Sequence, residues 1–205
     1  MRTVTLQSIL LRAWQRVGND ASTIDAIPSG ARTMMVAAAN ERIADCWEWA
    51  DWPELMRVES RTVQGDATNG YYIDYEQVGQ TAMGEVFGVL RDNPATHAAP
   101  RAIGYTLLRD AIRFPEDTDL PTTVWVNYRI RPTEYSASNL TATVPAVIAK
   151  AVALMLTSDL LTEDGQLDKA LAMEQMAESE LISQRDKYYF QQGQPSMWTA
   201  RVNQY

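Results

Sequence analysis

The fold of this chain is decided by the stretch Thr123-Val124-Trp125-Val126-Asn127-Tyr128-Arg129-Ile130. From Val124 to Arg131, the even positions carry side chains suited to a core. Most of the odd positions carry more polar side chains. A period of two predicts a β-strand with one buried and one solvated face, which is typical of an antiparallel sheet. The centre of the chain is therefore expected to be β-structure.

Further β-prone runs precede this strand. They are short, and Gly, Pro, Asp and Asn residues separate them. The runs cover residues 71–75, 85–90, 103–108 and 111–114. This spacing predicts an antiparallel sandwich or small barrel, and not the longer alternation of βαβ units.

Helical periodicity appears on both sides of the β-prone centre, where apolar residues recur every three or four positions. We expect helices over residues 5–17, 31–49, 144–161 and 167–190. Pro53 ends the second helix near Trp52, because proline disfavours helical geometry in the residue before it. Thr143 is expected to cap the third helix. Pro145 is tolerated near its start, because the first backbone N–H groups of a helix have no acceptor within the helix.

The predicted fold class is α+β, with a helical base of about four helices, an inserted antiparallel β lobe and an extended C-terminal tail. Residues 1–54 and 136–192 are expected to form the base, 55–135 the lobe and 193–205 the tail. Gly193 and Pro195 prevent the last helix from continuing. The tail is therefore extended or disordered when alone.

Composition restricts the classes of function. The 205 residues carry a formal net charge of -8, and the pI is near 4.7. Specific DNA binding is not expected, because neutralising phosphates needs clustered Lys and Arg. An acidic surface suits a passage through which DNA slides, and it equally suits a protein that is simply kept in solution by its charge.

Cys46, the only cysteine, excludes an intramolecular disulfide and a Cys-clustered metal site, and we expect it as a small buried hydrophobe. No run approaches the roughly 18 apolar residues that span a bilayer. Residues 1–5 do not begin a signal peptide. We therefore expect a protein that is made and kept in the cytoplasm.

Residues that could carry catalysis are few. His97, the only histidine, lies in a loop of small residues and prolines, where we expect it to be exposed. Glu116 and Asp119 could supply the carboxylate pair of a glycan or cell-wall hydrolase, although a solvated loop between strands is the simpler interpretation. We predict a protein that is not an enzyme, with no catalytic residues, cofactor or metal.

Three tryptophans, Trp47, Trp49 and Trp52, crowd the end of the second predicted helix. Trp47 fits the apolar stripe and is expected in the core. The other two cannot both share that face, so we expect them to cover the junction of helices and β lobe, with a partner surface as the alternative.

The layout as a whole resembles the head-tail adaptor, or connector, proteins of tailed double-stranded DNA bacteriophages, a group that includes the tail tubular protein A of short-tailed phages. The segments that carry the resemblance are 6–14, 41–55, the β insertion, 144–151 and the Ala- and Glu-rich stretch into 188–190. They cover nearly the full chain and match in pattern, without a diagnostic motif.

The resemblance implies a structural virion protein of the phage neck. Such a protein forms a homo-oligomeric ring, typically a dodecamer, that joins the portal protein to tail or nozzle proteins. DNA passes through the ring during ejection without specific binding, and no membrane is involved. A monomeric tail or head-completion protein is the alternative within the same setting.

The resemblance also implies that the tail docks on the portal. The residues expected to bind the portal are Gln194, Pro195, Met197, Trp198, Arg201, Val202 and Tyr205. Charges interleave on the last predicted helix as on a solvated face or a channel wall, and we expect Glu174 and Glu178 to face the channel.

Overall fold

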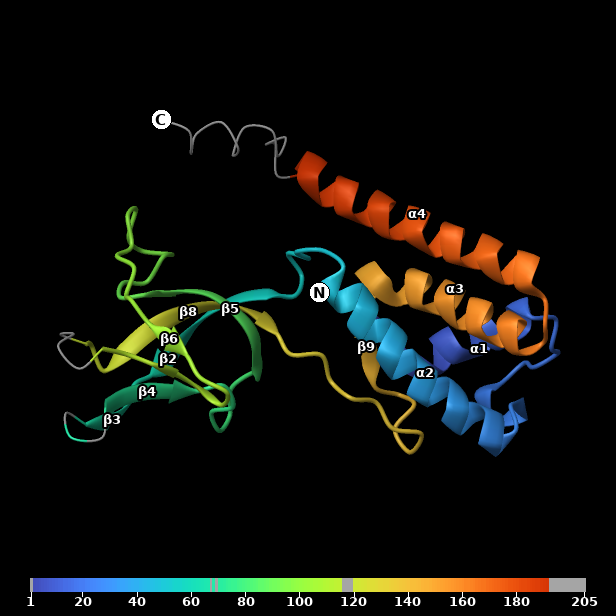
Figure 1. The fold of residues 1–205 in the computed structure, drawn as a ribbon, viewed down its shortest axis with the longest axis horizontal. Helices are drawn as coiled ribbons and strands as arrows, with labels where there is room; N and C mark the ends of the chain where they lie inside the picture. The colour runs from blue at the N-terminus through green and yellow to red at the C-terminus, as the bar shows by residue number, and fades with distance from the viewer. Residues whose placement is uncertain (1, 67, 69, 116–119, 192–205) are drawn as a thin grey trace. The chain divides into compact units, whose positions relative to one another are not determined.

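The computed structural model describes residues 2–66, 68, 70–115 and 120–191. The chain divides into two compact units, Met1–Glu54 together with Thr133–Tyr205, and Leu55–Pro132. The described residues combine four α-helices with antiparallel sheets (Figure 1), which confirms the mixed α and β character predicted from the sequence. The predicted tail, from residue 193, lies outside the described residues.

The first unit holds the α-helices. They are α1 (Leu6–Arg16), α2 (Ser29–Glu48), α3 (Ala146–Glu163) and α4 (Leu167–Gln191), with a 3-10 turn, η1 (Ile24–Ala26), between the first two. Each helix begins and ends within two residues of its predicted bounds. Cys46 and Trp47 are buried on α2, as predicted.

The central helix of this unit is α3, which contacts α1, α2 and α4. Figure 1 shows α4 running alongside it. Because neighbours surround α3, its apolar residues cover most of its circumference, as expected of a buried helix. Its buried Ser158 donates a hydrogen bond to the carbonyl of Ala170 at 2.9 Å, so this polar atom inside the packing is satisfied.

The start of α3 differs from the prediction. Thr143 does not cap the helix, because it belongs to β9 (Thr143–Pro145), which pairs antiparallel with β1 (Thr3–Thr5). Val144 is buried in this pairing, and the amide of Ala146 donates to the carbonyl of Arg2 at 2.9 Å. The backbone of the N-terminal segment therefore supplies the acceptor that a capping side chain would have supplied.

The second unit consists of two antiparallel sheets. One has the strand order β2 (Met56–Thr62), β8 (Thr123–Ile130), β5 (Met83–Leu90). The other has the order β3 (Gln64–Asp66), β4 (Gly70–Asp74), β7 (Ala111–Arg113), β6 (Thr106–Leu107). The strands predicted over 71–75, 85–90, 111–114 and 123–130 are confirmed.

The prediction of a single strand over residues 103–108 is wrong for the first half of that range. The amide of Ile103 donates to the carbonyl of Val89 on β5 at 2.9 Å, whereas Thr106 and Leu107 pair with β7 in the other sheet. This short segment therefore passes from one sheet to the other, which a local propensity does not reveal.

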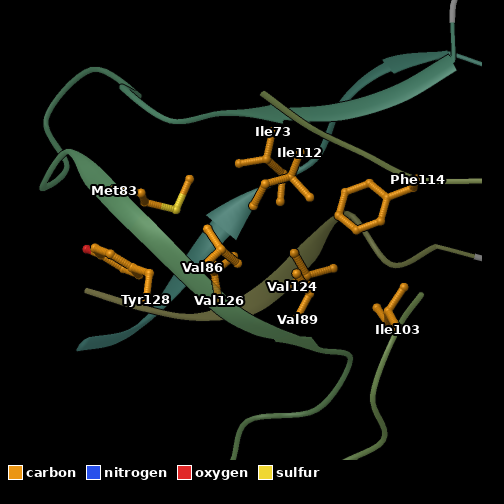
Figure 2. Packing of buried hydrophobic residues seen from close by; sticks show 10 residues of the cluster. All are labelled: Ile73, Met83, Val86, Val89, Ile103, Ile112, Phe114, Val124, Val126 and Tyr128. Carbon is orange, nitrogen blue, oxygen red and sulfur yellow. The ribbon is translucent and has the colours of Figure 1, made fainter. Parts of the chain in front are cut away.

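The two sheets share one hydrophobic core. Figure 2 shows Val124, Val126 and Tyr128 of β8 in the same cluster as Ile73 of β4 and Ile112 of β7, and all five are fully buried. The alternation that predicted this strand is confirmed at these three positions of β8.

Arg129 departs from the solvated face that the alternation predicted, since it is 8% exposed. Its guanidinium lies 5.7 Å from the centre of the Phe87 ring and 3.4 Å from a carboxylate oxygen of Glu85. Two residues of β5, Phe87 and Glu85, thus contact the charged group of Arg129 and make its burial tolerable.

Candidate functional site

All the residues predicted to bind a portal, Gln194 to Tyr205, lie outside the described residues, and their role stays a prediction. Glu174 and Glu178, which were predicted to face a channel, are both exposed on α4. Glu174 Oε1 lies 3.9 Å from Nη2 of Arg42 on α2, so its charge is partly shared with that helix.

The described residues include no catalytic site built from the residues that were considered for catalysis. Glu116 and Asp119 lie outside the described residues, and His97 is exposed as predicted. Within the described ranges, no group of three or more His, Cys, Asp or Glu is placed to hold a metal ion. None of the helices described is long and apolar enough to cross a membrane.

The first unit contains a hollow of about 350 Å³, named here the acidic hollow, where α1, α2 and α3 meet. Trp14, Met34, Leu156 and Leu160 contribute apolar surface to it, and Met34 is 62% exposed. The charged residues among its described lining are Asp159, Glu163 and Asp164. Its described lining is therefore largely apolar, and the charged residues of that lining are all acidic.

Arg42 of α2 holds the lining residue Asp159 in place. Its Nε donates to Asp159 Oδ2 at 3.0 Å and its Nη2 donates to Oδ1 at 2.5 Å, and this forked contact raises the pKa of Arg42. Asp45 lies 3.6 Å from the same guanidinium, and Glu174 lies 3.9 Å from it. Three acids around one cation leave surplus negative charge beside the hollow.

A second hollow, of about 290 Å³, adjoins the first through a shared lining residue, Val17. Leu154, Met173 and Met176 of α3 and α4 give it an apolar surface, and Arg16 and Lys169 are its charged lining residues. We name it the basic hollow. This unit thus carries two hollows that share Val17, one with acidic and one with basic residues as the charged part of its lining.

The other end of α4 is attached to the region that follows α2. The hydroxyl of Tyr188 donates to Glu54 Oε1 at 2.6 Å, and burial together with this hydrogen bond raises the pKa of Tyr188. Arg185 lies 5.5 Å from the ring centre of Trp49, which stacks on the buried Trp52. These contacts attach the last turns of α4 to the segment that follows α2.

The second unit contains a polar cluster that the sequence analysis did not single out. Arg61 is fully buried, and its Nη2 donates to the carbonyl of Thr81 at 2.6 Å and to the hydroxyl of Tyr128 at 2.8 Å. Tyr128 in turn donates to Glu59 at 2.7 Å. This cluster ties the segment before β5 to β2 and β8 around the fully buried Arg61, while Glu59 is partly exposed.

The available signal for this cluster was the spacing of Glu59 and Arg61, two residues apart on one strand, which places both on the same face. No such signal exists for the two hollows, because their linings come from helices far apart in the sequence.

No model of a known protein family matches the sequence, and no curated protein matches it.

Proposed function

We propose that this chain is a structural, non-enzymatic subunit of a bacteriophage neck: a head-to-tail adaptor that forms a ring, typically of twelve copies, between the portal and tail or nozzle proteins. In this proposal the first unit is the helical base of the adaptor and the second is a β lobe inserted into it. The residues from Gln194 to Tyr205 dock on the portal, and the protein resides in the virion.

The observation that carries the proposal is the pair of adjoining hollows on the first unit. Apolar surface with a polar edge is typical of protein contact sites. A contact between two different surfaces of identical subunits is heterologous, and it generates a ring when the rotation between subunits closes. An acidic and a basic hollow side by side give each subunit distinct surfaces for such contacts.

The charge distribution supports the passage of DNA through the ring. The chain carries a formal net charge of -8, and Glu174 and Glu178 are exposed on α4. In the proposed ring these two carboxylates face the channel. Negative charge there repels the phosphates, so that DNA slides without binding.

The direct test is electron microscopy of the full chain mixed with the portal protein encoded in the same genome. We expect rings seated on the portal. A chain that lacks residues 193–205 should keep its helical circular-dichroism spectrum but lose portal binding. The control is the full-length substitution Val78→Ser, which should bind the portal as the unaltered chain does. Full-length protein that neither forms a ring nor binds the portal contradicts the proposal.

A second test addresses the enzymatic alternative. Release of fragments from peptidoglycan by the full chain, abolished by Glu116→Gln, would replace a structural role with hydrolysis. The position of the coding sequence next to those of portal and tail-tube proteins would support the neck assignment independently.

A further inference from the structure

We propose that two copies of this chain, before they enter any ring, pair through strand β2, so that their three-stranded sheets join into one continuous sheet. The contact uses the side of β2 that faces away from β8, named here the open edge. It is two-fold, so it closes on itself in a pair. This inference goes beyond the proposed ring, whose contacts are heterologous and use other surfaces.

Strand β2 is the least protected sheet edge of the second unit. Its seven residues pair with β8 without a register shift, and among the described residues no second strand lies beside it. At the other edge of the same sheet, β5 has register shifts and a bridge from Leu90 to Ala102. The edges of the second sheet, β3 and β6, have only three and two residues. Short, bulged or covered edges resist pairing with another chain, and β2 has none of these three features.

Two hydrogen bonds just beyond the ends of β2 show which of its backbone groups face the open edge. The amide of Ile130 donates to the carbonyl of Leu55 at 3.0 Å. At the other end, the amide of Val63 donates to the carbonyl of Thr122, also at 3.0 Å. Bonded pairs alternate along an antiparallel ladder, so the odd-numbered residues of β2 bond to β8. The amides and carbonyls of its even-numbered residues therefore point to the open edge.

The middle of the open edge is accessible. Near one end, Gln77 Nε2 donates to the outward-facing carbonyl of Thr62 at 2.9 Å. Further along the strand, Val58 is 44% exposed and Ser60 is exposed. Both line an open hollow of about 400 Å³, together with residues 79–81. Open space thus adjoins the edge where Val58 and Ser60 could bond to another strand.

The side chains of β2 select a second copy of β2 as the occupant. Arg57 and Glu59 flank Val58, whereas Arg61 is fully buried and offers no surface. A complementary antiparallel strand carries an acid opposite Arg57, an apolar residue opposite Val58 and a base opposite Glu59. Because an antiparallel partner runs in reverse, the sequence Arg57-Val58-Glu59 has this pattern itself.

Charge also fixes the register of the pair. With Val58 opposite Val58 of the second copy, each Arg57 lies opposite Glu59 of the other copy. The nearest registers that keep outward-facing groups together place either Arg57 opposite Arg57 or Glu59 opposite Glu59, and like charges directly opposite are destabilising. In the favoured register, each Val58 exchanges both backbone hydrogen bonds with its counterpart, and each Met56 does so with Ser60 of the other copy.

The polar cluster around Arg61 fixes the position of the anion that this register needs. Glu59 Oε2 accepts from the hydroxyl of Tyr128 at 2.7 Å and from Arg61 Nη2 at 3.3 Å. Both bonds end on the same oxygen, and the Glu59 side chain is 35% exposed. A carboxylate accepts at both oxygens, so Glu59 can also receive Arg57 of the second copy.

The first test removes a backbone donor from the open edge. Val58→Pro deletes the outward-facing amide and leaves the ladder to β8 intact. In sedimentation without the portal, at up to about 1 mM chain, the unaltered protein should form dimers. Val58→Pro should associate at least about 10-fold more weakly, whereas Val58→Thr, which keeps the amide, should stay within about 2-fold. Circular dichroism verifies folding, and equal association of the Pro and Thr variants overturns the inference.

The second test checks the register. Residues of a hydrogen-bonded antiparallel pair have Cα atoms about 5.5 Å apart, within the range of a disulfide, so Val58→Cys should cross-link two copies under mild oxidation. Ser60→Cys is the matched control on the same edge, because its counterpart lies four residues away along the strand, about 14 Å. Cross-linking of Ser60→Cys at least as fast as that of Val58→Cys overturns the register and the charge argument with it. The native Cys46 does not interfere, because it is fully buried.

The third test addresses charge. Arg57→Glu places two acids opposite each other at both ends of the contact, so association should weaken about 5-fold or more. Arg57→Gln removes the attraction without adding repulsion and should weaken it less. Unchanged association of Arg57→Glu overturns the inference.

A final comparison separates this inference from other occupants and from the proposed adaptor. Deleting residues 193–205 should leave the Val58→Cys cross-link unchanged. A cross-link that forms only after this deletion shows that the deleted segment occupies the open edge, and it overturns the inference. A chain that stays monomeric without the portal also refutes the pairing, whereas rings seated on the portal would still support the adaptor function.

Discussion

Replacing Tyr188 with Phe tests the contact that fixes the end of α4. The Tyr188 hydroxyl donates to Glu54 Oε1 at 2.6 Å. A hydrogen bond to a charged group contributes about 1.5–3 kcal/mol, and a neutral one about 1 kcal/mol. Phe keeps the ring and removes only the donor. Because the pair is partly exposed, we expect a loss of about 1.5–2 kcal/mol at pH 7.

The loss should depend on pH with a defined sign. Burial and the hydrogen bond to Glu54 raise the pKa of Tyr188 in the folded chain. A raised folded pKa stabilises the fold below the unfolded pKa of about 10, and this contribution is lost as pH rises toward the folded pKa. At pH 11, ionisation of Tyr188 in the unfolded chain removes about 1.4 kcal/mol from the wild type and nothing from the Phe variant. The difference between the two should therefore shrink to about 0.5 kcal/mol or less.

The assay is urea unfolding of both proteins at pH 7 and pH 11, followed by helical circular dichroism. Tyr135→Phe is the matched control in the same unit, because its hydroxyl donates to the neutral carbonyl of Thr143 at 2.9 Å. We expect it to cost about 1 kcal/mol at pH 7. The reasoning is refuted if Tyr188→Phe costs less than Tyr135→Phe at pH 7, or if its cost grows at pH 11.

Three further predictions concern other parts of the chain. Ile112→Ala, in the core of the second unit, should lower the free energy of unfolding by about 2–5 kcal/mol in denaturant titrations, and a loss below about 1 kcal/mol would contradict the burial assigned to it. Glu178→Lys should raise the affinity for double-stranded DNA in low salt by filter binding, with the gain lost at high salt, whereas Glu178→Gln should have a smaller effect. Cys46 should react slowly with a thiol reagent at pH 8 and rapidly in urea, since burial raises its pKa to about 12; fast reaction of the folded chain would disprove this.

The sequence was sufficient to predict the elements whose pattern is local. The four helices follow from apolar residues at spacings of three and four, and β8 follows from the alternation at Val124, Val126 and Tyr128. These predictions succeeded because a helix or strand with one buried face repeats its pattern within a few residues.

The predictions that failed depended on partners far away in the chain. Thr143 looked like a helix cap, but β9 pairs with β1, whose sequence lies more than a hundred residues earlier. Arg129 occupied a position predicted to be solvated, but Phe87 and Glu85 of a neighbouring strand cover it. Neither the β1–β9 pairing nor the contacts of Arg129 can be predicted from the local sequence pattern.

The sequence by itself determined the four helices, the strands β4, β5, β7 and β8, the acidic balance and the burial of Cys46, because each depends on composition or on a short period. Only the tertiary structure decided which side chains share a surface. Met34, Leu160 and Glu163 meet at one hollow because α2 packs against α3, and the hydrophobic effect that drives this packing depends on buried area and not on the order of residues along the chain. The surface on which the proposed ring contact depends therefore exists only in the folded protein.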